Sequence, residues 1–188
     1  MFDYRAPSAL HREDSVLLII DIQERLRPAI AAAEHIVEQA EKLTQVSQLL
    51  DVPIVVTEQY PQGLGATVES LQKHVQQAAV IEKIHFSAMR EEHLPLALET
   101  LKRKQIVVCG TETHVCVLQT VLDLLQAGYD VYVVTDIVGS RDPANKELAL
   151  QRMAAEGAAL VSYEMVVFEW LERAGTDTFR HVSKNFVV

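Results

Sequence analysis

The sequence has only two cysteines and no long apolar run, and each of these shortages excludes some classes of protein. Cys109 and Cys116 are not spaced as a CxxC pair, and no second pair accompanies them, so neither a zinc centre nor a thioredoxin-like redox site is predicted. No segment approaches the roughly 18 apolar residues that span a bilayer. The first residues mix charges with apolar side chains and lack the apolar centre of a signal peptide. We therefore expect a cytoplasmic protein without a structural disulfide.

Basic residues are also scarce. Lys and Arg number 17 against 26 Asp and Glu, which gives a formal net charge of −9 and a pI near 5.2. Nucleic acids and anionic membranes attract proteins through clusters of Lys and Arg. The nearest such cluster, KRK at 102–104, is expected at the end of a short helix, where cations complement the helix dipole. Neither a nucleic acid nor a membrane is therefore expected as a partner.

Glycine-rich phosphate loops are absent as well. The segment after the first apolar run, DIQERLRP (21–28), contains neither GxGxxG nor GxxxxGK. In these two patterns, backbone amides hold the phosphates of dinucleotides or nucleotides. A dinucleotide or ATP enzyme is therefore not expected, and we predict no cofactor.

Six short runs rich in β-branched residues alternate with longer segments of helical periodicity. The runs are residues 15–21, 52–57, 78–83, 105–110, 129–136 and 158–162, and the helical segments include 31–50, 114–127 and 142–157. Nearly all of the runs are continuously apolar, which is typical of strands buried on both faces. Strands that alternate with helices form βαβ units. We therefore predict one domain, residues 1–188, with a three-layer αβα architecture around a six-stranded, mainly parallel, Rossmann-like sheet.

Three chemically functional residues lie where predicted strands end, and ligands bind parallel sheets at that carboxyl edge. Asp21 ends the first run, Lys83 ends the third, and Cys116 follows the fourth. A carboxylate can take the thiol proton, while a cation and the positive end of a helix lower the thiol pKa from about 8.5. The thiolate can then attack a carbonyl carbon, with backbone N–H groups holding the oxyanion.

Each of these residues also has a structural interpretation. Asp is common as a helix cap, Lys83 can be a solvated side chain, and a free cysteine is usually packed in a core. We predict such a core position for Cys109, which lies in the apolar run IVVCG. It is the joint placement of Asp21, Lys83 and Cys116 at three strand ends that favours a catalytic site.

The motifs around these residues resemble one family. LLIIDIQ with Asp21, IEKIHFSAM with Lys83 and VVCGTETHVCV with Cys116 are similar to the isochorismatase-like cysteine hydrolases, which include nicotinamidases, carbamoylsarcosine hydrolases and isochorismatases. The resemblance runs over almost the whole chain. It implies that Asp21, Lys83 and Cys116 form a catalytic triad, with a cis peptide bond at Thr111–Glu112. It also implies an oxyanion hole made of the backbone N–H groups of Glu112 and Cys116.

A further stretch, TEQYPQGLGATV (57–68), narrows the resemblance to the isochorismatase domain-containing hydrolases of bacteria and eukaryotes. Nicotinamidases carry an Asp-x-His after the second strand and a further His, and these residues hold a metal. This chain has Glu58, Gln59 and Tyr60 at that place, so we predict no metal and do not expect nicotinamide as substrate. Glu58 together with His85 and His114 is an alternative set of metal ligands.

The pocket walls are predicted from position relative to the strand ends. The predicted substrate-binding residues are Gln23, Glu58, Tyr60, Phe86 and His114, with Glu112 as a further polar candidate. Tyr60 and Phe86 form an aromatic wall in this interpretation. For Phe86, a place in the core is an equal alternative.

The predicted function is hydrolysis of a small amide-like C–N bond through a thioester on Cys116, because cleavage of a vinyl ether needs no thiol. Two alternatives stay open: an isochorismate-type vinyl-ether hydrolase, and a binding protein that keeps the fold without catalysis. The expected partners are a small-molecule substrate and further copies of the chain. The apolar segment MVVFEWL (165–171) offers a contact surface for such copies, and its burial within the chain is an equal alternative.

Overall fold

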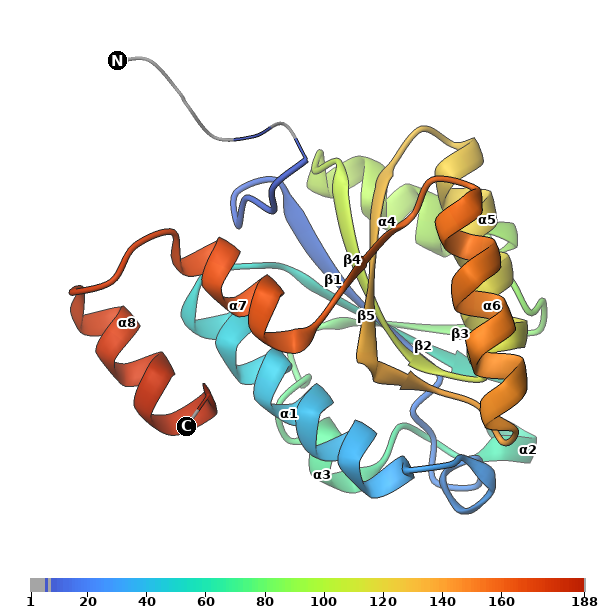
Figure 1. Cartoon of the computed structure of the whole chain (residues 1–188). Coiled ribbons are helices and arrows are strands. Elements are labelled where there is room, and N and C mark those ends of the chain that lie inside the picture. Colours follow the sequence, from blue (N-terminus) through green and yellow to red (C-terminus); the bar gives the residue numbers. More distant parts are fainter. Residues whose placement is uncertain (1–5, 7, 188) are drawn as a thin grey trace.

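A six-stranded sheet forms the centre of the molecule (Figure 1). The computed structural model describes residue 6 and residues 8–187. The strands are β1 (Ser15–Ile20), β2 (Ile54–Gln59), β3 (Ala79–Lys83), β4 (Gln105–Thr111), β5 (Asp130–Gly139) and β6 (Ala159–Val161). Their order across the sheet is β3-β2-β1-β4-β5-β6, and every pair of neighbours is parallel. The prediction of a six-stranded, mainly parallel sheet is confirmed.

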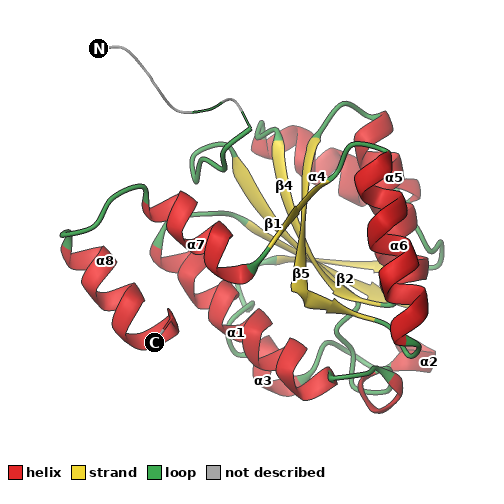
Figure 2. Ribbon diagram, in the orientation of Figure 1, coloured by secondary structure: helices red, strands yellow, loops and turns green. Residues whose placement is uncertain are grey.

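Helices cover both faces of this sheet (Figure 2). They are α1 (Ala33–Leu49), α2 (Pro61–Leu64), α3 (Glu69–Gln72), α4 (His93–Leu101), α5 (Leu118–Gln126), α6 (Pro143–Ala155), α7 (Tyr163–Leu171) and α8 (Asp177–Val182). The helices α1 and α7 pack on one face, whereas α4, α5 and α6 pack on the other. The predicted three-layer αβα architecture is therefore confirmed.

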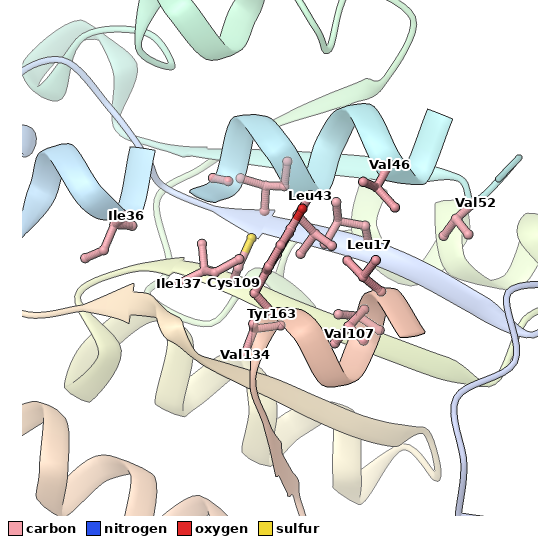
Figure 3. Packing of buried hydrophobic residues seen from close by; sticks show 14 of the residues in the cluster. Leu17, Ile36, Leu43, Val46, Val52, Val107, Cys109, Val134, Ile137 and Tyr163 are labelled. Carbon is pink, nitrogen blue, oxygen red and sulfur yellow. The ribbon is translucent and has the colours of Figure 1, made fainter. Parts of the chain in front are cut away.

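The two faces of the sheet belong to separate apolar clusters, because successive side chains of a strand point in opposite directions. In β1, Leu17 and Ile19 belong to the cluster with α1 and α7, whereas Leu18 and Ile20 belong to the opposite cluster. Figure 3 shows the first cluster, in which Cys109 of β4 lies among apolar side chains. Cys109 is fully buried, as its place in an apolar run predicts.

The strand β2 extends further than the apolar run predicts. It continues past Thr57 to Gln59, because Glu58 and Gln59 still pair with Glu82 and Lys83 of β3. The apolar run ends before these polar residues, so the predicted strand stopped at Thr57. The consequence is that Gln59 lies directly beside Lys83 at the carboxyl edge.

A glycine lets β4 approach the end of β1 closely. Gly110 has a φ of 141°, and a Cβ atom at this position would lie 2.1 Å from the carbonyl oxygen of Ile20. Only glycine tolerates so close a backbone contact. The hydroxyl of Thr111 then donates a hydrogen bond to the carbonyl of Asp21. The ends of β1 and β4 are thus joined beside the carboxyl edge.

The apolar segment 165–171 lies in α7 and is mostly buried within the chain. Val166 and Trp170 are fully buried, whereas Phe168 is 41% exposed. The indole N–H of Trp170 donates a hydrogen bond of 2.9 Å to the hydroxyl of Ser15. Of the two alternatives for this segment, burial therefore holds for its larger part.

Candidate active site

Asp21, Lys83 and Cys116 come together at the carboxyl edge of the sheet. Asp21 follows β1, Lys83 ends β3, and Cys116 lies in a π-helical turn, Thr113–Val117, between β4 and α5. The Nζ of Lys83 lies 2.8 Å from Oδ2 of Asp21, and both side chains are fully buried. Sγ of Cys116 lies 3.9 Å from Oε1 of Gln59, which also accepts from Nζ of Lys83. The structure therefore brings the three residues together, while their catalytic roles stay predictions.

The two carboxylate oxygens of Asp21 have different surroundings. Oδ1 accepts a hydrogen bond of 2.7 Å from the hydroxyl of Thr57. Oδ2 is buried and faces the ammonium of Lys83, but no hydrogen bond is directed at it. The Asp21–Lys83 pair is thus a close ion contact rather than an aligned hydrogen bond. A role of Oδ2 as acceptor of the Cys116 proton stays a prediction.

The ammonium of Lys83 directs its hydrogen bonds to neutral acceptors. Its Nζ donates to Gln59 Oε1 at 2.6 Å, to the Phe86 carbonyl at 3.1 Å and to the His85 carbonyl at 3.4 Å. An ammonium has three N–H donors, so the protein itself satisfies this group. Lys83 is therefore a buried, fixed cation, and the interpretation as a solvated side chain is wrong.

Two residues that hold the triad in place were not predicted. Thr57 holds Asp21, and Gln59 holds Lys83. They lie two positions apart on β2, so their side chains point to the same face of the sheet. The parallel register, which pairs Thr57 with Ile20 and Gln59 with Lys83, is the signal that places them at the site.

The environment of Cys116 raises the pKa of its thiol. Burial is the largest cause, and the negative charge of Asp21 acts in the same direction, while Lys83 opposes it. The prediction of a lowered pKa is therefore wrong, because it counted the cation but not the desolvation of the thiolate. The role of Cys116 as a nucleophile stays a prediction. Burial alone raises the pKa of Cys109 to about 12.

The turn that carries Cys116 differs from the expected one. The Thr111–Glu112 bond is trans, since the described part of the chain contains no cis peptide bond, and the predicted cis bond is wrong. Glu112 instead has a left-handed conformation, with φ 57° and ψ 62°, and this turns the chain after β4. The N–H groups of Val115 and Val117 donate to the Glu112 carbonyl. An oxyanion hole at the N–H groups of Glu112 and Cys116 stays a prediction.

The side chain of Glu112 is buried and paired. Its Oε1 lies 2.8 Å from Nε of Arg141, and its Oε2 lies 3.3 Å from Nδ1 of His114. His114 also contacts the hydroxyl of Ser140 at 3.0 Å. These contacts fix the turn before Cys116 to the chain that follows β5.

Two of the predicted substrate-binding residues hold a loop. The side-chain amide of Gln23 donates to the carbonyls of Gln59 and Gly65, and its oxygen accepts from the Gln59 N–H. Oε1 of Glu58 accepts from the N–H and the hydroxyl of Thr67. Both residues therefore fasten the segment after β2, and contacts of either with a substrate stay predictions.

Two aromatic side chains stand out from this edge. Tyr60 and Phe86 are each 52% exposed, so the alternative of a core position for Phe86 is wrong. An aromatic ring that is half exposed retains apolar surface that a ligand can cover. An aromatic wall made of these two residues stays a prediction.

Access to the triad is narrow. Cys116 is 4% exposed and Lys83 is 2% exposed. A groove of about 850 Å³ runs along the free edge of β3 against α4, but none of the three residues lines it. Cys116 and Lys83 are therefore almost closed off from solvent in this arrangement.

The three residues of the alternative metal-ligand set contact different partners. Within residue 6 and residues 8–187, no three His, Cys, Asp or Glu side chains are arranged to hold a metal ion. Glu58 holds the loop after β2, His85 contacts Glu91, and His114 contacts Glu112. The structure thus gives no support to a ligand set of Glu58, His85 and His114.

The loop after β3 is fixed by Glu91. One oxygen of its carboxylate accepts from the N–H groups of Ile84 and His85 and lies 2.9 Å from Nδ1 of His85. The same loop presents the carbonyls of His85 and Phe86 to Lys83. These hydrogen bonds, that of the His85 N–H first, lower the pKa of the Glu91 carboxyl to about 2.

We expect Glu91→Gln to destabilise the protein in a pH-dependent way. The ionised carboxylate stabilises the fold above the ordinary pKa of 4.5, and this contribution is lost as the pH falls toward 2. Urea unfolding should therefore give the variant a lower free energy of unfolding than the wild type near neutral pH. This difference should shrink in acid. Glu92→Gln, at an exposed neighbouring position, is the control. A difference in the free energy of unfolding that does not change with pH contradicts the role of the Glu91 charge.

The fold and the site together define a three-layer α/β domain that carries an acid, an amine and a thiol at the carboxyl edge of its sheet. Residues 15–165 match the isochorismatase domain, and the chain belongs to this family. The membership confirms the resemblance to the isochorismatase-like superfamily that the motifs predicted. It also supports a hydrolase function.

Relatives cover nearly the whole chain. The secreted isochorismatase effector Isc1 of Phytophthora sojae is 39% identical over 176 residues, or 90% of this chain and 83% of the effector. Isochorismatase domain-containing protein 2A of Mus musculus is 39% identical over 173 residues, or 92% of this chain and 82% of that protein. The structure of the MAR1 ribonuclease from Caenorhabditis elegans has a TM-score of 0.90 and 31% identity, covering 96% of this chain and 93% of that one.

Proposed function

We propose that this chain is a cysteine hydrolase that cleaves a small amide-like C–N bond through a thioester. The observation that carries the proposal is a buried cluster in which Lys83 pairs with Asp21, and Gln59 joins Lys83 to the thiol of Cys116. Family membership supports hydrolase chemistry, and the thiol favours acyl transfer over vinyl-ether cleavage, which needs no nucleophilic sulfur. In this proposal Cys116 is the nucleophile, Asp21 is the base, and Lys83 is the fixed cation.

The reaction begins when Oδ2 of Asp21 takes the thiol proton as the sulfur of Cys116 attacks the carbonyl carbon. A C–S bond forms, and the backbone N–H groups of Glu112 and Cys116 stabilise the negative oxygen. The proton then passes from Asp21 to the leaving nitrogen, and the C–N bond breaks to give an amine and a thioester. Lys83 offsets the negative charge of the site during these steps.

Hydrolysis of the thioester completes the cycle. Asp21 takes a proton from water while the water oxygen attacks the thioester carbon. The C–S bond breaks, the acid leaves, and the sulfur of Cys116 regains the proton from Asp21. Tyr60 and Phe86 supply the apolar wall of the proposed pocket, and Gln23, Glu58 and His114 supply its polar groups.

Labelling with iodoacetamide tests this proposal. Cys116 should react far faster than Cys109, because only Cys116 has an acceptor for its proton beside the sulfur. Equal and slow labelling of both thiols would favour a binding protein that keeps the fold without catalysis. Full turnover of isochorismate by a Cys116→Ala variant would favour vinyl-ether hydrolysis.

One relative is described as a ribonuclease, which raises RNA as a competing substrate. The charge of this chain opposes that function, since a net charge of −9 repels a polyanion. In the basic triplet 102–104, Arg103 donates to the backbone carbonyls of Arg12 and Ser15, which supports a structural role. Loss of a labelled RNA oligonucleotide in the presence of the protein, abolished by Cys116→Ala, would overturn the preference for a small substrate.

We further propose that residues 1–188 act as one cytoplasmic domain without a cofactor, which binds a small-molecule substrate and assembles with copies of itself. None of the described helices is long and apolar enough to cross a membrane. The Isc1 relative is described as secreted, so localisation of the tagged chain in intact cells is the direct test. Analytical ultracentrifugation tests the assembly.

A further inference from the structure

Gln59 lies between Lys83 and Cys116. Its Oε1 is 2.6 Å from Nζ of Lys83 and 3.9 Å from Sγ of Cys116. The side chain is 8% exposed, so water does not compete effectively for these contacts. This neutral amide therefore touches two of the three residues of the proposed triad.

The orientation of the Gln59 amide follows from its neighbours. Its Nε2 donates a hydrogen bond of 2.8 Å to the carbonyl of Ile84. The opposite orientation would set NH₂ against the ammonium of Lys83 and oxygen against the Ile84 carbonyl, with repulsion at both ends. The oxygen therefore faces Lys83 and the thiol.

The backbone of Gln59 is held as firmly as its side chain. Oε1 of Gln23 accepts from the Gln59 N–H at 2.8 Å, and Nε2 of Gln23 donates to the Gln59 carbonyl at 3.0 Å. Parallel pairing with Lys83 fixes the strand position. The amide oxygen is thus placed by contacts at the backbone and at both ends of the side-chain amide.

The hydrogen bonds of Lys83 are directed to neutral oxygen atoms. Gln59 accepts the shortest of them, and the loop carbonyls of His85 and Phe86 accept the others. Oδ2 of Asp21 is only 2.8 Å from Nζ and yet receives no directed hydrogen bond. The ammonium beside Asp21 is therefore held by these neutral acceptors, and Gln59 supplies the acceptor that also reaches the thiol.

We propose that Gln59 is a positioning residue, whose neutral oxygen accepts hydrogen bonds from both Lys83 and the thiol of Cys116 and so holds these two groups beside Asp21. The inference rests on the proposed function of this site and deepens it. Neutrality is part of the role, because the charged groups that face the sulfur are one carboxylate and one ammonium, Asp21 and Lys83. The nearby Glu112 carboxylate is paired with Arg141.

Two variants of Gln59 test separately the neutral charge of its side chain and its hydrogen-bond acceptor. Gln59→Glu keeps the shape and adds an anion beside the sulfur, which disfavours the thiolate. We expect the midpoint of the pH profile of Cys116 labelling by iodoacetamide to rise by about one unit, which is about tenfold slower labelling below the midpoint. Gln59→Met removes the acceptor without adding charge, so that Lys83 and the thiol lose the oxygen they share and labelling slows by about tenfold.

The control is Gln76→Glu, which adds the same charge at an exposed position and should label as the wild type does. Variants that keep the wild-type circular dichroism, and also the wild-type pH profile and rate of labelling, would overturn the inference. A lower melting temperature with unchanged labelling would assign Gln59 a merely structural role and would overturn it as well. Failure of the proposed function gives a different result, since wild-type Cys116 would then label no faster than Cys109.

Discussion

Replacing Cys116 with alanine should abolish amide hydrolysis while the fold persists. The variant loses the only atom that can form the thioester, so kcat/KM should fall by at least about 10⁴-fold. The ion pair of Asp21 and Lys83 does not depend on the sulfur, and the site should therefore stay assembled. Ammonia release from a panel of small primary amides measures the activity, and circular dichroism measures the fold.

Cys109→Ala is the matched control for this experiment. It makes the same substitution at the other buried thiol, which lies in the apolar cluster between the sheet and α1. We expect this variant to lose some stability and to keep its kcat/KM, because Cys109 and Cys116 belong to separate apolar clusters on opposite faces of the sheet. Activity of Cys116→Ala within tenfold of the wild type contradicts the account.

Replacing Lys83 with methionine should have the largest effect on stability. Methionine matches the length of the side chain but leaves the buried carboxylate of Asp21 without its cation. Breaking a buried ion pair on one side costs about 3–5 kcal/mol, so the free energy of unfolding should fall by that amount. Urea unfolding at neutral pH measures it.

A double variant tests whether this loss comes from the unpaired charge. Asp21→Asn combined with Lys83→Met removes both charges, and it should recover at least half of the stability lost by Lys83→Met alone. Activity should stay lost, because neither base nor cation is present. A double variant that is less stable than the single one would show that the deficit lies in packing rather than in charge.

The fold could be predicted closely because each element has a local signal. The continuously apolar runs mark the six strands, and alternation with amphipathic segments implies parallel pairing. The end of β2 was missed, since Glu58 and Gln59 carry polar side chains that interrupt the apolar pattern. Pairing with β3 extends the strand in spite of these polar side chains. Such pairing cannot be predicted from the sequence of β2 alone.

The candidate site could be predicted in part. Asp21, Lys83 and Cys116 are placed by topology, because carboxyl ends of parallel strands share one edge. The raised pKa of Cys116 depends on burial from all sides, and the left-handed turn at Glu112 depends on tertiary contacts such as that with Arg141. Such features depend on tertiary packing and cannot be predicted from the local sequence.

The central claim is that three distant segments act as one nucleophilic unit that passes through a thioester. Peptide mass spectrometry after acid quenching of the protein with the amide panel tests it most directly. The account predicts an acyl group on Cys116 that is absent from the Cys116→Ala variant. Turnover of an amide with no adduct on Cys116, or with the acyl group on another residue, would contradict it.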